Sequence, residues 1–275
     1  MARIHWLVLA LALAGGGGLG HAREADRWED LFFPYAINIS SPTLSHYVVF
    51  TPTYFRGDRG SAFAPSLQLA QVVTRHLGLQ VTIPAQLGWD GQPSGVEDIT
   101  LNVEYLAAGS LRYDNLLSVG AIASFPTGGK ALGDGDYFVG AFVIGGQRFL
   151  DRRIVIEGNI QALLPIVHAA TARQLGFDGL LALLVTPQRQ NFPLPLYVEM
   201  ELNSTVYLDG TSGLPSGAKT TPTATLALAP ELFFGPFRTA LSDTTRLSLA
   251  VFFNVVGDPA HAQTYAASFA FNIPK

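Results

Sequence analysis

Side chains that could carry out catalysis are few in this chain, and their spacing argues against a catalytic centre. After residue 22 the histidines are His46, His76, His168 and His261, and no two of them have the spacing of a metal-binding pair. Ser45 and His46 are adjacent, so in a strand their side chains would point to opposite faces and could not act as nucleophile and base. We therefore expect no catalytic residues and no enzymatic activity.

Acidic side chains in Gly/Asp-rich turns offer a second kind of chemistry. Asp134 and Asp136 lie in one such turn and Asp58 lies in another. Carboxylate oxygens of this kind can ligate calcium. The same composition is typical of an ordinary solvated turn, which is the interpretation we favour. We therefore expect neither a metal nor a cofactor.

The elements that position the remaining charged residues show a strict two-residue period. In the segment 99–105 the apolar or aromatic positions are Ile99, Leu101, Val103 and Tyr105. The residues between them are Thr100, Asn102 and Glu104. This alternation predicts a β-strand with one apolar and one polar face. It recurs in the segments 77–87, 154–164, 196–208 and 247–255.

The whole chain contains about twelve segments of this kind. Most have about 11 to 15 residues, which exceeds the usual length of a strand in a soluble sheet and suits a tilted strand that crosses a bilayer. The predicted strands are residues 45–56, 62–74, 75–87, 96–107, 112–125, 136–149, 151–164, 176–187, 193–208, 222–234, 243–256 and 262–273.

Composition favours a membrane barrel over a soluble sheet protein. Only 14% of the residues are charged, 48% are hydrophobic and the mean hydropathy is +0.28. A soluble sandwich or ligand-binding barrel can show the same alternation, but its outer face usually carries many charged residues. We predict an all-β fold, a transmembrane antiparallel up-and-down β-barrel over residues 45–275 in the outer membrane of a Gram-negative bacterium. The net charge of -4 argues against nucleic acid as a partner.

The N-terminal region has the pattern of an export signal. Arg3 precedes an apolar run at residues 6–14, and Gly20-His21-Ala22 is a small-x-small cleavage site. We expect residues 1–22 to be a signal peptide. Residues 23–44 form a separate segment, in which Trp28, Leu31 and Phe32 have helical spacing. We expect this segment either to plug the barrel or to lie on its periplasmic rim.

If the apolar faces meet lipid, the polar faces line the interior. Buried charges need partners, so Arg148 is expected to form a network with glutamates. Such a network either braces the barrel or guides a solute, and its mixture of carboxylates and aromatic rings suits weakly polar or aromatic solutes. Phe138, Phe142 and Phe252 are expected on the same face. The candidate lumen residues are Glu104, Arg148, Glu157, Tyr197, Glu199, Glu201 and Tyr207.

Residues 95–149 resemble a known family. The stretches "GVEDITLNVEYL", "SVGAIASFPTGG", "KALGDGD" and "YFVGAFVIGGQRF" are similar to the meta-pathway phenol-degradation family of outer-membrane β-barrel transporters. The chain departs from that pattern at Glu104, where such families commonly carry a basic residue, and at its C-terminus, which continues past Phe271. We still expect 262–273 to be the closing strand.

The resemblance implies a channel or transporter for small hydrophobic or aromatic compounds. The expected partners are outer-membrane lipid and that solute. Two alternatives stay open: a structural or adhesive outer-membrane barrel, and a soluble periplasmic ligand-binding β-protein.

Overall fold

The computed structural model describes the part of the chain that forms the strands and their shorter connections. The described residues are 42, 44–57, 60–110, 114–129, 132–133, 135–150, 153–167, 172–186, 195–208, 223–237, 245–256 and 263–272. Among them, no helix is long and apolar enough to cross a membrane. The strands are β1 (Tyr47–Gly57), β2 (Gly60–Thr74), β3 (Leu77–Trp89), β4 (Gly95–Val96), β5 (Ile99–Ser110), β6 (Asn115–Phe125), β7 (Phe138–Phe149), β8 (Ile154–Pro165), β9 (Gln174–Leu184), β10 (Leu196–Tyr207), β11 (Thr223–Phe237), β12 (Thr245–Val256) and β13 (Gln263–Asn272).

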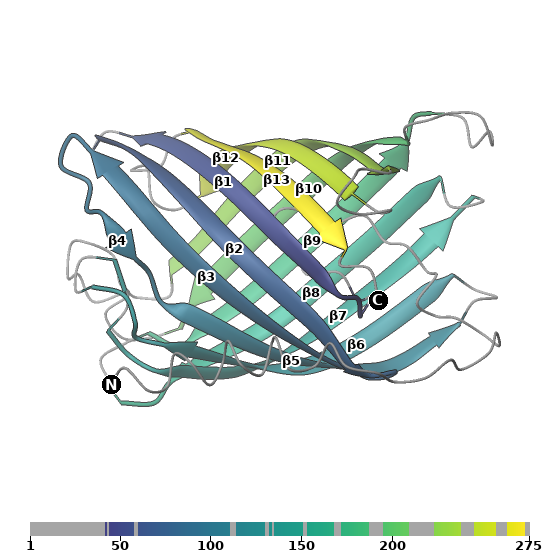
Figure 1. Cartoon of the computed structure of the whole chain (residues 1–275), viewed down its shortest axis with the longest axis horizontal. Helices are drawn as coiled ribbons and strands as arrows, with labels where there is room; N and C mark the ends of the chain where they lie inside the picture. The colour runs from purple at the N-terminus through teal and green to yellow at the C-terminus, as the bar shows by residue number, and fades with distance from the viewer. Residues whose placement is uncertain are drawn as a thin grey trace.

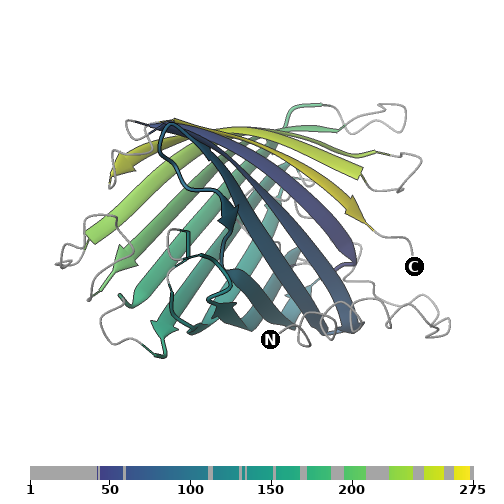
Figure 2. The same ribbon diagram turned by 60° about the vertical axis from the view of Figure 1, so that its left-hand side comes forward.

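The sheet closes into a barrel of twelve long antiparallel strands. Each long strand pairs with its neighbours in the chain, and β1 pairs with both β2 and β13. The register of the closing pair places Tyr47 opposite Asn272. The thirteenth strand, β4, has two residues and pairs only with β3. Figures 1 and 2 show the steeply tilted strands of the barrel from two sides. The predicted fold is confirmed, including the closing strand; β4 was not predicted.

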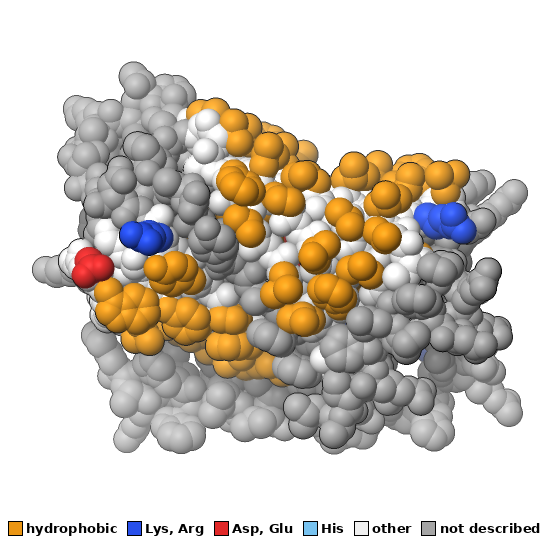
Figure 3. Space-filling view, turned by 90° about the horizontal axis from the view of Figure 1, so that it is seen from above, with side chains coloured by type: hydrophobic (Ala, Val, Ile, Leu, Met, Phe, Trp, Pro, Cys, Tyr) orange, Lys and Arg blue, Asp and Glu red, His pale blue; other side chains and the backbone are white. Residues whose placement is uncertain are grey.

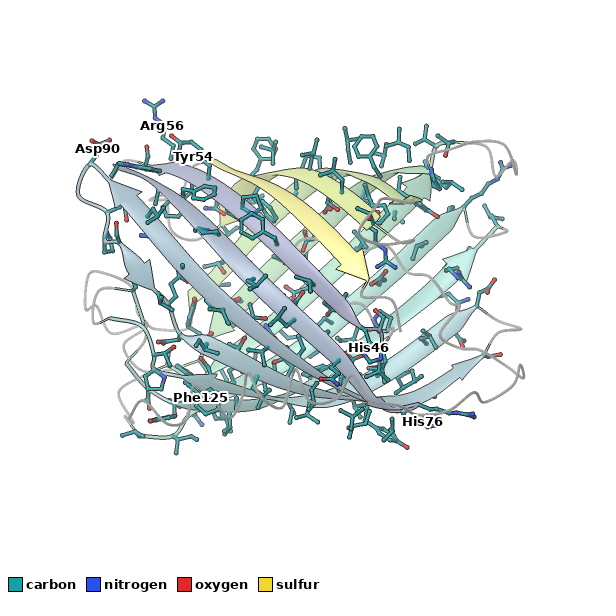
Figure 4. All side chains as sticks on the ribbon, viewed as in Figure 1. His46, Tyr54, Arg56, His76, Asp90 and Phe125 are labelled. Atoms are coloured by element: carbon teal, nitrogen blue, oxygen red, sulfur yellow. The ribbon has the colours of Figure 1, made fainter. Side chains whose placement is uncertain are left out.

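The two ends of the barrel differ in their connections. We call the end where β1 begins the terminal end and the end where it finishes the loop end. Figure 4 shows Arg56 and Asp90 at the loop end and His46 and His76 at the terminal end. The short connections 75–76, 111–114 and 150–153 lie at the terminal end, and the longer 126–137 and 208–222 lie at the loop end. The connection 185–195 is longer than predicted for the terminal end.

On β6, β7, β8 and β10 the side chains alternate between an exposed, mainly apolar face and a buried face that carries the polar groups. On β10, Val198, Met200 and Leu202 are 45, 45 and 38% exposed. Tyr197 and the two glutamates that alternate with them are buried. Figure 3 shows hydrophobic side chains gathered across one outer face, with the charged side chains near the ends. The apolar face points outward, which is the reverse of a soluble sheet. This is the arrangement expected of a barrel surrounded by lipid.

The segment 99–105 follows the same rule. Tyr105 is 50% exposed on the outside. One carboxylate oxygen of Glu104 and the side-chain oxygen of Asn102 are fully buried. The predicted assignment of its faces is therefore confirmed. Fold and exterior together are those of a barrel that spans a membrane, as expected.

A glycine allows close packing inside the barrel. Gly120 of β6 lies opposite Phe142 of β7. A Cβ at Gly120 would collide with the Phe142 ring and with the carbonyl oxygen of Val103. The glycine thus provides the space that the Phe142 ring occupies next to β6.

Candidate functional site

Four glutamates form a buried group on the interior faces of three strands. Glu199 of β10 lies directly opposite Glu231 of β11. Glu157 of β8 and Glu201 of β10 both face Leu180 of the intervening strand β9, so they occupy one row across the sheet. We call this group the carboxylate cluster. The exposed fractions are 2% for Glu157, 1% for Glu199, 0% for Glu201 and 2% for Glu231.

Within the described part of the chain, two members of the carboxylate cluster have carboxylate oxygens that accept no hydrogen bond. Both carboxylate oxygens of Glu157 and of Glu199 lack a hydrogen-bond partner. Glu199 also experiences the charges of its three acidic neighbours, and Glu157 is attracted by Arg246. Since buried carboxylates require compensation, this part of the interior favours positive charge or hydrogen-bond donors over anions.

Among the described residues, two buried arginines lie toward the terminal end. Arg148 forms an ion pair with Asp114, with 2.6 Å between Nη2 and Oδ1. The sequence predicted a network of Arg148 with glutamates. The structure shows an ion pair of Arg148 with Asp114, a residue of the 111–114 turn, and the cation that acts on Glu157 is Arg246 of β12. Glu231, Arg246 and Asp114 were not among the predicted lumen residues.

The predicted lumen residues occupy the inner face. Glu104, on the far side of the interior, lies beside Ser118 of β6. Tyr207 is half-buried on the face of β10 that also carries Tyr197. The rings of Tyr197 and Phe233 meet edge to face with centroids 5.8 Å apart. The buried residues of the predicted set are Arg148, Glu157, Tyr197, Glu199 and Glu201, together with the aromatic residues Phe138, Phe142 and Phe252.

An apolar layer crosses the interior at the terminal end. Its side chains come from the inner faces of six strands and from the segment before β1, and partly buried Val72 and Leu184 pack against it. Leu44 lies over Gly78 of β3, where an added Cβ would come within 2.9 Å of the leucine Cδ2. The apolar layer consists of Leu44, Leu106, Leu116, Val155, Ala182, Tyr197 and Phe233.

The segment before β1 is anchored inside the barrel. Pro42 is fully buried, and its carbonyl oxygen accepts a 3.0 Å hydrogen bond from the Ser118 hydroxyl. Near the start of β1, the Tyr47 hydroxyl donates to the Gln80 side chain at 2.9 Å. These contacts hold Leu44 within the apolar layer.

The loop end contains a cavity instead of an apolar layer. Its volume is about 380 Å³, and its wall comes from β5 to β9 together with the 90–98 and 126–137 connections. Asp98 joins these two connections, because its Oδ1 accepts a 2.9 Å hydrogen bond from the Gly128 N–H. The lining residues are Glu97, Asp98, Thr100, Ile122, Ser124, Leu132, Phe138, Leu163 and Gln174.

Asp136 has a structural role at the loop end. The side chain is fully buried, and its Oδ1 accepts hydrogen bonds from the N–H groups of Tyr137 at 2.7 Å and Val167 at 3.0 Å. The expectation of a solvated turn is therefore wrong at this position, because the carboxylate ties the start of β7 to the end of β8. Asp58 and Asp134 lie outside the described residues.

The described histidines are separate residues near the terminal end. His46 Nδ1 accepts a 3.4 Å hydrogen bond from the Val72 N–H, and the ring of His76 lies 6.0 Å from that of Tyr105. His168 and His261 lie outside the described part of the chain. Within that part, no group of three or more His, Asp or Glu side chains is arranged to hold a metal ion.

Comparisons with known proteins place the fold among outer-membrane channels. No protein-family model and no curated protein matches the chain. An outer-membrane channel from Pseudomonas putida F1 is similar with a TM-score of 0.58 and 14% identity, over 86% of this chain and 98% of that one. The NanC porin is similar with a TM-score of 0.53 and 9% identity, over 82% of this chain and 100% of that one. The KdgM porin in complex with disordered oligogalacturonate is similar with a TM-score of 0.51 and 6% identity, over 83% of this chain and 99% of that one.

At these identities the likeness concerns the fold. The chain is an outer-membrane β-barrel with the architecture of channels and porins. Its membership of the meta-pathway phenol-degradation family stays a prediction from the sequence.

Proposed function

We propose that the protein is an outer-membrane channel that passes small hydrophobic or aromatic compounds and performs no chemistry on them. The observation that carries this proposal is the reversal of faces, with apolar side chains outside and carboxylates and aromatic rings inside. The channel and porin architecture supports it. Outer-membrane lipid and the solute are the proposed partners, and nucleic acid is not one.

The family assignment is part of the proposal. The segments that resemble the meta-pathway phenol-degradation family come together at the loop end, where Asp98 accepts a hydrogen bond from Gly128. Gly133 packs so closely against the same carboxylate that a Cβ there would collide with it. A shared structural role for these motif residues supports the assignment.

The solute path that we propose runs past the carboxylate cluster. The solute would meet Glu104, Arg148, Glu157, Tyr197, Glu199, Glu201 and Tyr207. Oligogalacturonate, which is present in the KdgM complex, is a polyanion. Glu199 and its acidic neighbours would repel such a ligand, so we propose that the solute here is not an acidic sugar.

The N-terminal assignments are proposals as well. We propose that residues 1–22 are a signal peptide and that the segment 23–44 enters the terminal end of the barrel. The burial of Pro42 and the packing of Leu44 in the apolar layer support the second assignment. In this arrangement the segment would restrict passage through the lumen.

A structural or adhesive barrel is the second candidate function, and the apolar layer favours it. Side chains that fill the interior at the terminal end would be sufficient for a barrel whose loops act alone. The soluble alternative would leave the apolar outer face in water, at a large cost in free energy.

Flux into liposomes tests the proposal. We expect the wild-type protein to pass phenol faster than a sugar of equal size, and the double change Glu199→Gln and Glu201→Gln to alter phenol flux without changing the unfolding midpoint. An unchanged flux with a lowered midpoint would show that the glutamates only brace the barrel. Equal flux of phenol and sugar would overturn the solute class. Membrane fractionation and the shift in gel mobility on heating separate a barrel from a soluble protein.

A further inference from the structure

The cavity at the loop end has the dimensions of a ligand site. Its volume of about 380 Å³ lies within the range of about 300–1,000 Å³ that is usual for small-molecule pockets. A single aromatic ring needs roughly 150 Å³, so the space accommodates a one-ring molecule with a short polar substituent. The cavity is lined by residues of five strands and two connections.

One part of the cavity wall is apolar. Phe138 of β7 is buried and contributes a ring, and Ile122, Leu132 and Leu163 provide aliphatic surface. An apolar ring placed against these side chains would be removed from water, which favours binding. This part of the wall would therefore contact an apolar, ring-sized part of a ligand.

The other part of the wall is polar and carries only negative charge. Thr100, Ser124 and Gln174 contribute hydroxyl and amide groups, and Glu97 and Asp98 contribute carboxylates. Among the described residues that line the cavity there is no Lys, Arg or His. An anionic ligand would therefore meet repulsion from this wall, where the described lining residues supply no compensating cation.

Glu97 is held in place by its backbone. Its N–H donates to the Pro84 carbonyl at 3.0 Å, and its own carbonyl accepts from the Thr127 hydroxyl at 3.1 Å. Asp98 already accepts a hydrogen bond from Gly128. The geometry thus separates the two acids: Asp98 joins the two connections, and Glu97 has an anchored backbone from which its carboxylate reaches the cavity wall.

We propose that the loop-end cavity binds small organic cations, in which a protonated amine meets Glu97 and a ring-sized apolar body packs against Phe138. This inference rests on the proposed function insofar as the cavity lies at the mouth of the proposed channel. It deepens that function by assigning a charge preference.

The ionisation of Glu97 gives the proposed site a pH dependence. Burial, and to a lesser extent the charge of Asp98, raise the pKa of Glu97 above the ordinary value for a glutamate. The carboxylate must be ionised to attract an ammonium group. Binding is therefore expected to be complete above this raised pKa and to weaken as the pH falls through it, at a pH higher than an unperturbed glutamate would give.

Binding of three ligands with the same ring tests the proposal. Benzylammonium, benzyl alcohol and benzoate are titrated into the full-length protein in detergent micelles, and binding is followed by ligand-observed NMR. We expect benzylammonium to bind about tenfold more tightly than benzyl alcohol, as for a hydrogen bond to a charged group, and benzoate to bind most weakly. Glu97→Gln should reduce the affinity for benzylammonium to that for the alcohol.

Asp90→Asn is the matched control. Asp90 is an exposed acid of the same connection that does not line the cavity, and its φ of 55° is one that asparagine tolerates. Its removal should leave all three affinities unchanged. A second variant, Leu163→Phe, fills the cavity and should weaken benzylammonium and benzyl alcohol alike, and the heat-dependent shift in gel mobility verifies folding of each variant.

Two results would overturn the inference. One is equal affinity for the three ligands in the wild type, and the other is the same loss of benzylammonium binding in Asp90→Asn as in Glu97→Gln. Binding is measured without a membrane gradient, so it is independent of flux. Absent binding with intact phenol flux contradicts only this inference, whereas charge-selective binding without any flux contradicts only the proposed channel.

Discussion

The interior of the barrel has opposite character at its two ends, although the same alternating strands build both. At the terminal end, apolar side chains from six strands and Leu44 pack into a layer. At the loop end, the equivalent inner faces surround a cavity with an acidic wall. Under the proposed function, closure and binding would be separate tasks at different ends of one lumen. The carboxylate cluster lies between them on β8, β10 and β11.

Breaking the apolar layer should have the largest effect. Leu44→Asp places a carboxylate among apolar side chains, and its hydration should draw water into the layer. Because dry apolar constrictions block conduction, we expect the single-channel conductance in planar bilayers to rise on the order of tenfold. Leu44→Met, which keeps the volume, should conduct like the wild type. Equal conductance of Leu44→Asp and wild type would show that the layer does not limit passage.

Loosening the loop end should affect stability more than conductance. Asp98→Ala removes the acceptor of the Gly128 N–H and is expected to cost about 2 kcal/mol in the free energy of unfolding, measured by urea titration in micelles. Asp98→Asn keeps an acceptor oxygen and should recover most of this loss. If both variants unfold at the wild-type urea concentration, the two connections are not held together by Asp98.

The ion pair near the terminal end should have a smaller effect. Asp114 has a φ of 51°, which asparagine adopts readily, so Asp114→Asn removes the charge and leaves the turn conformation intact. Arg148 is almost fully buried but the Asp114 side chain is 25% exposed, so we expect a loss of about 1–2 kcal/mol, less than for a fully buried pair. Asp90→Asn, with a similar φ and no ion pair shown, serves as the reference in the same urea titration.

Removing one hydrogen bond of the N-terminal segment should have the smallest effect. Ser118→Ala eliminates the donor to the Pro42 carbonyl and should lower the free energy of unfolding by about 1 kcal/mol. Conductance should increase only slightly, since Leu44 still packs over Gly78. Ser118→Thr retains the hydroxyl and is the control. A conductance as high as that of Leu44→Asp would mean that the Pro42 contact alone holds the segment in place.

The alternation of the sequence was sufficient to predict the strands and their faces. Glu157, Glu199 and Glu201 were placed on the inner face because each is flanked by exposed apolar residues. Glu231 was missed although it shares a face with Ala229 and Phe233, both of which are buried. Its apolar neighbours within the strand concealed the one acidic position, and only the pairing with β10 shows that it faces Glu199.

Contacts between distant strands could not be predicted in the same way. Alternation determines the face of a residue, but the register and tilt of the strands determine which inner residues meet. For this reason the partner of Arg148 was not foreseen, and neither was the position of Arg246 near Glu157. The loop-end cavity also depends on the contact between the 90–98 and 126–137 connections, for which the sequence contains no periodic signal.

The pairing of β1 with β13 has a consequence for biogenesis. This ladder joins residues from nearly opposite ends of the chain, such as Tyr47 and Asn272. Contacts of such large sequence separation form slowly, and a barrel without its last strand would expose two unpaired edges to hydrocarbon. Insertion must therefore await translation and export of the whole chain. A nascent fragment lacking Gln263–Asn272 has no stable place in the bilayer.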